Sequence, residues 1–189
     1  FETERLLIRV PRAGDGAEAN LATRESLAEL EPWMPWVDPV PSVNETEGTL
    51  RRARAHFLER KDIWLALFHK DSGMFVGGSG LHNPRWEVPS FEIGYWVRTS
   101  LCRKGFATEA VLGITAFGFE QLHAKRIQIQ CSARNTASER VMIKAGFKRE
   151  ALLANERRGL DGKLHDTLMY ALTDEDWRRR EGKPSIRVL

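Results

Sequence analysis

The order of strand and helix patterns constrains the fold of this chain more than any other feature. Short apolar or alternating runs, which are typical of β-strands, lie at 5–10, 63–69, 74–81, 91–98, 126–133 and, as a last pair turning at LDGK (160–163), within 147–173. Helical patterns lie at 15–30, 42–60, 106–122 and 135–146. The segment EPWMPWVDPVP (31–41) is irregular, because proline continues neither a helix nor a central strand. Strands and helices in this mixed order predict one α/β domain with a mixed sheet.

Polar residues mark several of the helix boundaries. Asp15 is a candidate N-cap for the first helix. Ser42, with Glu45 three residues later, forms the pattern of a capping box. Asn135 is the candidate cap of the last helix, and Gly146 is its C-terminal stop. These signals support the helix assignments independently of the apolar pattern.

Length, charge and cysteine content exclude several classes of protein. A chain of 189 residues suits one domain with a full core, here 1–189 with a flexible tail expected over 178–189. The net charge of +3 is too small to indicate nucleic-acid binding by itself. No apolar run approaches the roughly 18 residues of a membrane span, and FETERLLIRV lacks a signal-peptide segment. Cys102 and Cys131 fit neither a disulfide framework nor a metal-ligand spacing, so we expect a cytoplasmic protein without a metal.

The stretch RKGFATEA (103–110) opens a long apolar helix without a capping side chain. Arg103, Lys104 and Gly105 stand where Ser, Thr, Asp or Asn usually caps a helix, and the two cations oppose the helix dipole. Free N–H groups at a helix start, with a glycine that allows close approach, can bind an anion. A Walker A loop is absent, and GGSGLHN (77–83) lacks the third glycine of a dinucleotide fingerprint.

Three segments in order, EIGYW (92–96), KGFATEA (104–110) and NTASERVMIKAGF (135–147), resemble the GNAT family of N-acetyltransferases. Within that family they are most similar to the branch that modifies ribosomal-protein N-termini, the RimJ/RimL type. The resemblance extends over nearly the whole chain, from RLLIR to HDTLMYAL. It implies a single-domain GNAT fold of the α/β (α+β) class, with a mixed, mostly antiparallel sheet of about seven strands, a splayed central strand pair and helices on both faces.

The resemblance implies that the anion is the pyrophosphate of acetyl-coenzyme A. Backbone N–H groups of six consecutive residues would bind it: Arg103, Lys104, Gly105, Phe106, Ala107 and Thr108. The pantetheine arm would pair with the backbone of Trp96 and Val97, and Asn135 and Ser138 would contact the same arm. The family often has Gln, Arg or Trp at the position of Cys102 and Gly at that of Arg103. Binding by backbone amides tolerates both departures, while two alternatives stay open for the Arg103 side chain: a clash with the phosphates or an added contact to them.

Two side chains match catalytic positions of the family. Glu92 faces away from the apolar residues of its strand and matches the general base of histone-acetylating members; the alternative is a surface glutamate. Ser138 matches the serine that protonates the departing thiolate in RimL-type enzymes; the alternative is a serine that only satisfies helix N–H groups. His165 and Asp166 are neighbours on a strand and point to opposite faces, so they cannot form a relay.

The resemblance implies that the acceptor enters between the irregular segment 31–41 and the last strands. Trp33 and Trp36 are expected both to wall the acceptor site and to pack on the core. We expect direct transfer in a ternary complex, because no activated nucleophile is evident. The resemblance favours the N-terminal α-amine of a protein such as a ribosomal protein, while a polyamine, aminoglycoside or amino acid, or a non-catalytic module that binds coenzyme A, stays open. Neither a membrane nor direct nucleic-acid readout is expected, and the choice between a monomer and a homodimer stays open.

Overall fold

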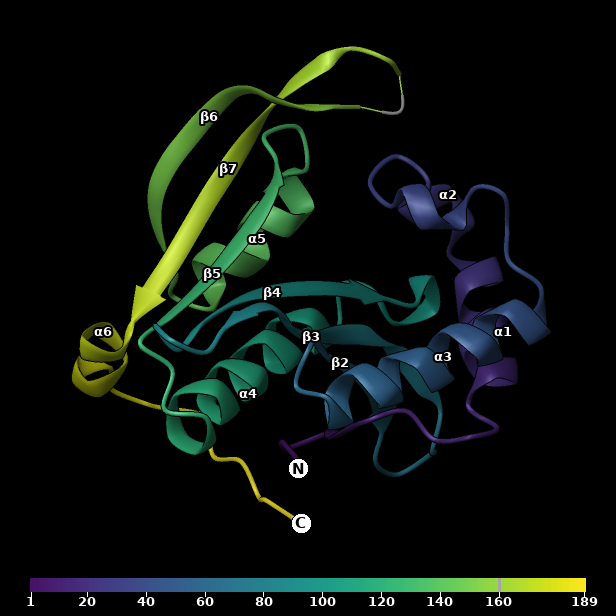
Figure 1. Ribbon diagram of the computed structural model, residues 1–189, viewed down its shortest axis with the longest axis horizontal. Helices are drawn as coiled ribbons and strands as arrows, with labels where there is room; N and C mark the ends of the chain where they lie inside the picture. Colours follow the sequence, from purple (N-terminus) through teal and green to yellow (C-terminus); the bar gives the residue numbers. More distant parts are fainter. Residues whose placement is uncertain (160) are drawn as a thin grey trace.

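The computed structural model describes residues 1–159 and 161–189, which form a sheet of seven strands in the order β1-β2-β3-β4-β5-β7-β6 (Figure 1). The strands are β1 (Leu6–Arg9), β2 (Ile63–His69), β3 (Phe75–Arg85), β4 (Ser90–Val97), β5 (Arg126–Ser132), β6 (Lys148–Arg158) and β7 (Leu164–Thr173). The helices are α1 (Gly16–Glu25), α2 (Leu27–Leu30), α3 (Val43–Leu58), α4 (Phe106–Gln121), α5 (Thr136–Lys144) and α6 (Asp174–Arg179), with short 3₁₀ turns η1 (Pro35–Val37) and η2 (Thr99–Leu101). Only β4 and β5 pair in parallel within this described sheet. The predicted fold class and mostly antiparallel mixed sheet are confirmed.

Alternating side chains along the strands create a core on each face of the sheet. Leu65 and Leu67 of β2 face the larger core, which α4 and α5 cover. Ala66 and Phe68 of the same strand face a smaller core, to which α1 and α3 contribute (Figure 1). Helices therefore lie on both faces, as predicted.

Two predictions for the first helix need correction. The helix expected over 15–30 is interrupted at Ser26, whose buried Oγ accepts a hydrogen bond from Thr99 N at 3.0 Å. This contact with η2 joins residues that are far apart in the sequence, so no local sequence pattern could predict it. Asp15 occupies the N-cap position of α1, but its side chain makes no capping bond. Its carboxylate is instead paired with Arg9 at 2.7 Å.

Strand β3 is longer than predicted. It continues through Pro84 to Arg85, in a region that the sequence indicated as a loop. The pairing of β3 with β4 shifts register between His82 and Arg85. A proline is tolerated in a strand where such an irregularity removes the need for its N–H.

The remaining helix boundaries follow the predicted signals. The capping box of Ser42 and Glu45 is present in both directions. The Asn135 side chain caps α5, and Gly146 follows that helix with a φ of +80°. Leu160, the first residue of the predicted LDGK turn, lies outside the described residues. No helix in the described part of the chain is long and apolar enough to cross a membrane.

The C-terminal part contains one helix that the sequence analysis missed. Helix α6 has a capping box between Thr173 and Asp176, a signal that was available in the sequence. Within 178–189, the range of the predicted tail, Arg187 pairs through its backbone with Glu2. The flexibility of that range stays a prediction.

Candidate functional site

The central strands β4 and β5 pair over three residues and then part. Ser90–Glu92 of β4 is in register with Arg126–Gln128 of β5. Beyond Glu92, the described pairing of β4 is with β3, and that of β5 is with β7 (Figure 1). The facing edges of 93–97 and 129–132 therefore have backbone groups that need other partners. The splayed strand pair is confirmed, and it opens directly after Glu92.

A short loop separates the end of β4 at Val97 from the start of α4 at Phe106. The N-cap of α4 is Gly105, which has a φ of +87° and provides no capping side chain. The first N–H groups of a helix have no partner within the helix, so those of α4 are available to an anion. Arg103 also has a positive φ, +62°. Its exposed side chain and that of Lys104 add positive charge next to the first N–H groups of α4.

The other predicted residues of this turn differ in which of their groups are accessible to a ligand. The Phe106 side chain is buried in the larger core, so only its backbone can reach a ligand. Ala107 and Thr108 are half-buried in the first turn of α4. The loop before the helix is held by Arg5, whose Nη1 donates to Lys104 O at 2.9 Å.

Glu109 fixes the start of α4 to the N-terminal segment, a role that the sequence analysis missed. Its Oε1 accepts from Thr3 Oγ1 at 2.6 Å and from Arg5 N at 2.7 Å, and its Oε2 accepts from Arg5 Nε at 2.7 Å. Burial raises the pKa of the Glu109 carboxyl, but these hydrogen bonds outweigh it and hold the pKa below its ordinary value. The carboxylate lies in the first turn of the helix, where negative charge is favourable.

Ser138 lies on α5, on the other side of the splay from β4. Its backbone N–H, and not its hydroxyl, makes the bond of the helix cap, donating to Asn135 Oδ1 at 3.0 Å. The Tyr95 hydroxyl of β4 lies 2.9 Å from Ser138 Oγ and also donates to Ser138 O at 3.0 Å. Burial raises the pKa of Tyr95, so this hydroxyl keeps its proton. The two hydroxyls therefore connect the strand before the gap to the helix after it.

Glu92 lies at the foot of the splay, where β4 and β5 separate. It is half-buried on the face opposite the larger core, as the alternation predicts. Gln128 Nε2 donates to Glu92 Oε2 at 3.3 Å. The residue directly opposite Glu92 on β3 is His82, which the sequence analysis left without a role.

One of the two tryptophans of the proline-rich loop packs against β4. The ring centroid of Trp36 lies 5.9 Å from that of Trp96 on β4, which is itself 5.9 Å from that of Phe75. Trp36 is nevertheless 47% exposed and Trp33 37% exposed. Trp36 therefore both packs on the splayed strand and presents a surface to solvent beside it. The wall role of the two residues stays a prediction.

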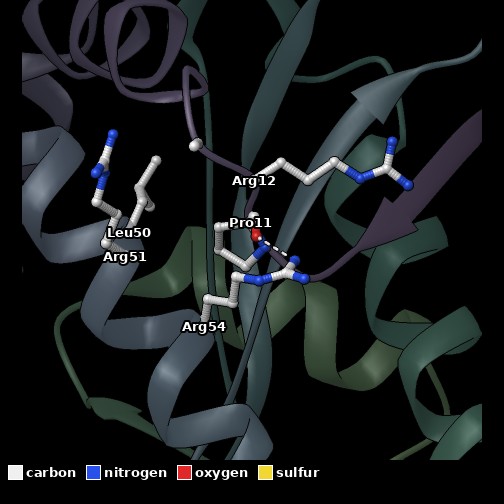
Figure 2. Close-up of a pocket in the computed structure, with 6 residues that line it drawn as sticks. Pro11, Arg12, Leu50, Arg51 and Arg54 are labelled. Atoms are coloured by element: carbon white, nitrogen blue, oxygen red, sulfur yellow. Dashed lines mark hydrogen bonds between the residues drawn. The ribbon is translucent and has the colours of Figure 1, made fainter.

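A cavity of about 510 Å³ lies away from these residues, between the β1–α1 connection and α3 (Figure 2). Pro11, Arg12, Leu50, Arg51 and Arg54 line it, together with Ala13. Arg54 Nη1 donates to Pro11 O at 3.3 Å. None of the predicted site residues lines this cavity, so its concavity does not identify the catalytic site.

His165 and Asp166 do not form a relay, as predicted. The His165 Nε2 atom lies 3.0 Å from an oxygen of Asp161. Asp166 Oδ1 instead accepts a hydrogen bond from Asn155 N at 2.9 Å.

Comparison with known proteins connects this geometry to a family. Residues 5–148 match the family model described as an acetyltransferase (GNAT) domain. An uncharacterized N-acetyltransferase of Bacillus subtilis, YoaA, is 27% identical over 172 residues, covering 91% of this chain and 95% of the relative. The ribosomal protein uS5-alanine N-acetyltransferase of Escherichia coli is 24% identical over 179 residues, covering 93% and 91% of the two chains. A ribosomal α-N-protein acetyltransferase, RimL, solved with coenzyme A, superposes with a TM-score of 0.84 at 18% identity over 92% of this chain and 97% of that one, which shows the shared fold.

Proposed function

This chain belongs to the GNAT acetyltransferase family, and we propose that it transfers the acetyl group of acetyl-coenzyme A to the N-terminal α-amine of a protein by direct attack in a ternary complex. The family and the named relatives make it an N-acetyltransferase. The observation that carries the proposal is the splay of β4 and β5 beside the start of α4. It combines a slot of unpaired backbone with a group of free helix N–H donors.

The residues of the slot fit coenzyme A. A pantetheine arm has amide groups that can pair with a strand edge, and the edge of β4 near Trp96 and Val97 is open toward β5. A pyrophosphate needs several N–H donors at short range, which the turn before α4 offers with Gly105 at its centre. A side chain at Gly105 would stand in the way of that approach. Asn135 and Ser138, at the start of α5, would contact the same arm.

The bound thioester supplies an activated acetyl group. Side chains of this protein accept the proton that the amine loses and donate the proton that the leaving sulfur gains. The amine nitrogen forms a bond to the carbonyl carbon, the carbon–sulfur bond breaks, and the sulfur leaves with the electron pair. Ser138 donates its hydroxyl proton to that sulfur, and Tyr95 exchanges its hydrogen bond to Ser138 O for one to Ser138 Oγ, which lies 2.9 Å away. Glu92, at the foot of the splay, attracts the cationic amine and is the candidate base acting through a water.

An α-amine suits this site better than a lysine side chain. Its reference pKa of about 7.7 to 8.0 lies well below the value of about 10.4 for lysine, so more of it is neutral near pH 7. The E. coli relative is named for alanine N-acetylation of a ribosomal protein, which supports the same choice. Trp36 beside the splayed strand would bound the entering N-terminus on one side.

The proposal is tested by following thiol release from acetyl-coenzyme A with a panel of acceptors. The panel contains peptides that begin with Ser or Ala, the same peptides with a blocked N-terminus and an internal lysine, a polyamine, an aminoglycoside and free amino acids. We expect release with the free N-terminal peptides and none with the blocked ones. Release with a small amine alone would overturn the protein acceptor. Binding of acetyl-coenzyme A without transfer to any acceptor would overturn the enzymatic role.

A further inference from the structure

A histidine–carboxylate pair lies beside the splay on the same face as Glu92. His82 of β3 is directly opposite Glu92 of β4, so both side chains project from one face of the sheet. Asp62 immediately precedes β2, whose first residue Ile63 is paired with Leu81. The His82 Nδ1 atom lies 2.9 Å from Asp62 Oδ1 and 3.1 Å from Asp62 Oδ2.

This contact determines which ring nitrogen carries the proton in the neutral imidazole. An ionised carboxylate can only accept, so His82 Nδ1 must be the N–H donor. The lone pair of Nε2 then remains available. Within residues 1–159 and 161–189, Nε2 has no hydrogen-bond partner, and the side chain is 26% exposed.

Two glycines make room for the His82 ring next to the reaction slot. A Cβ atom on Gly80 would lie 3.0 Å from Nε2, and one on Gly94 would lie 3.5 Å from it. Gly94 follows Glu92 by two residues on β4, in the part of the strand that has left β5. The Nε2 atom therefore lies over the beginning of the splay, and larger residues at these positions would displace it.

We propose that His82, oriented by Asp62, takes the proton of the acceptor amine in place of Glu92, whose carboxylate then only attracts the cationic amine, a role that rests on the proposed acetyl transfer. The amine forms its bond to the acetyl carbon and gives one proton to His82 Nε2, directly or through a water. The imidazolium that results is stabilised by Asp62 and by the neighbouring charge of Glu92, and it returns the proton to solvent. The electron pair of the broken carbon–sulfur bond leaves with the thiolate.

An imidazole is better suited to this task than a carboxylate. Reference pKa values of about 6.5 for imidazole and 4.3 for a glutamate side chain make the former the stronger base toward an α-ammonium. Glu92 also shares its carboxylate with Gln128, whereas His82 Nε2 is unshared among the described residues. Asp62 is a positioning residue in this arrangement, because it acts through the ring.

The first test is spectroscopic and does not depend on turnover. Long-range ¹H–¹⁵N spectra of the intact protein with ¹⁵N-labelled histidine, assigned by comparison with His82→Gln, report which ring nitrogen is protonated. We expect the Nδ1–H form for neutral His82, and a shift toward Nε2–H in Asp62→Asn. An Nε2–H form in the unsubstituted protein would overturn the proposal, because that nitrogen could not accept a proton.

The second test is kinetic, with acetyl-coenzyme A and the acceptor peptide. We expect His82→Gln and Asp62→Asn each to lower kcat by about 100-fold, at the lower end of general-base contributions, and the double variant to be no worse than His82→Gln. The Kd for acetyl-coenzyme A should stay unchanged, and added imidazole should restore part of the activity of His82→Ala. His56→Gln, an exposed histidine of α3, is the matched control and should retain full activity.

The outcomes separate this role from the proposed function and from a structural one. A His82→Gln variant that is less heat-stable but keeps its kcat would show that the pair only joins β2 to β3, and would overturn the proposal. A loss confined to acetyl-coenzyme A binding would overturn it as well. An unsubstituted protein that acetylates no acceptor would instead overturn the proposed function on which the role depends.

Discussion

The hydroxyl of Ser138 is the single-residue feature that most directly tests the leaving-group chemistry. Ser138→Ala keeps the backbone N–H that donates to Asn135 and removes only the hydroxyl next to Tyr95. We expect kcat to fall by about 10- to 100-fold, near the lower limit for general acids, because a free thiol has a pKa of only about 8.5. The Kd for acetyl-coenzyme A, measured by calorimetry, should be unchanged.

A control for that variant lies on the same helix. Thr136→Ala removes an exposed hydroxyl from the first turn of α5 and should leave kcat as it is. Equal activity of Ser138→Ala and the unsubstituted enzyme would contradict the role of Ser138 as proton donor to the thiolate. Ser138 would then be only a structural residue in the first turn of α5.

Glu109 makes a residue-scale prediction about stability and pH. Its folded pKa lies below the ordinary value of 4.5, so the ionised form stabilises the fold above that pH and the contribution disappears as pH falls through the folded pKa. Glu109→Gln should therefore lose about 1–3 kcal/mol at pH 7, the usual loss for a buried hydrogen-bond partner. Denaturant unfolding should show that the difference narrows below pH 4.5.

The exposed Glu120 at the other end of α4 provides the comparison. Glu120→Gln should change the unfolding free energy by less than about 0.5 kcal/mol at any pH, as surface substitutions usually do. A Glu109→Gln variant that behaves in the same way would contradict the anchoring role.

At the scale of elements, the conformation of the turn before α4 allows a prediction of how Gly105 contributes to acetyl-coenzyme A binding. Gly105 has a φ of +87°, and a Cβ atom there would lie 3.3 Å from Arg5 Nη2. Gly105→Ala should cost about 1–2 kcal/mol of stability through the left-handed backbone. It should also weaken acetyl-coenzyme A binding, because the N–H donors of the turn shift with it. Thermal unfolding and calorimetry separate the two effects.

Gly14 offers a matched element-scale control. Its φ is +98°, a Cβ atom there meets nothing within 4 Å, and it lies in the β1–α1 connection. Gly14→Ala should lose similar stability and keep its affinity for acetyl-coenzyme A. Equal loss of affinity in both variants would mean that Gly105 acts through stability alone.

The same scale shows what the sequence could and could not predict. The alternating run at 126–133 and the capped helix after it were predicted within two residues, because their signals are local. The break at Ser26 was not predicted, because the contact that accompanies it, with Thr99, comes from η2. His82 was overlooked for a related reason. Its partner Asp62 is 20 residues away and reaches it only through the pairing of β2 with β3.

At the scale of the whole molecule, two separate places among the described residues carry groups that suit an anionic ligand. One is the splay with the turn before α4, which provides backbone donors and an open strand edge. The other is the cavity lined by Arg12, Arg51 and Arg54 at the β1 side of the sheet (Figure 2). Charge alone would favour the arginines, whereas the fit to an extended arm with amide groups favours the splay.

Hydrogen exchange with and without acetyl-coenzyme A decides between these two places. We expect protection of amides over 93–97 and 103–108, because the ligand pairs with the open strand edge and the helix start. The free energy of global unfolding should rise by about 2.7 kcal/mol at a ligand concentration 100 times Kd. The exchange of α3 amides should slow by no more than this global stabilisation accounts for. Protection centred on Arg51 and Arg54 of α3, with the splay unaffected, would move the cofactor site to the arginine cavity. The catalytic roles of Glu92 and Ser138 would then fail together, since both depend on a thioester held between β4 and β5.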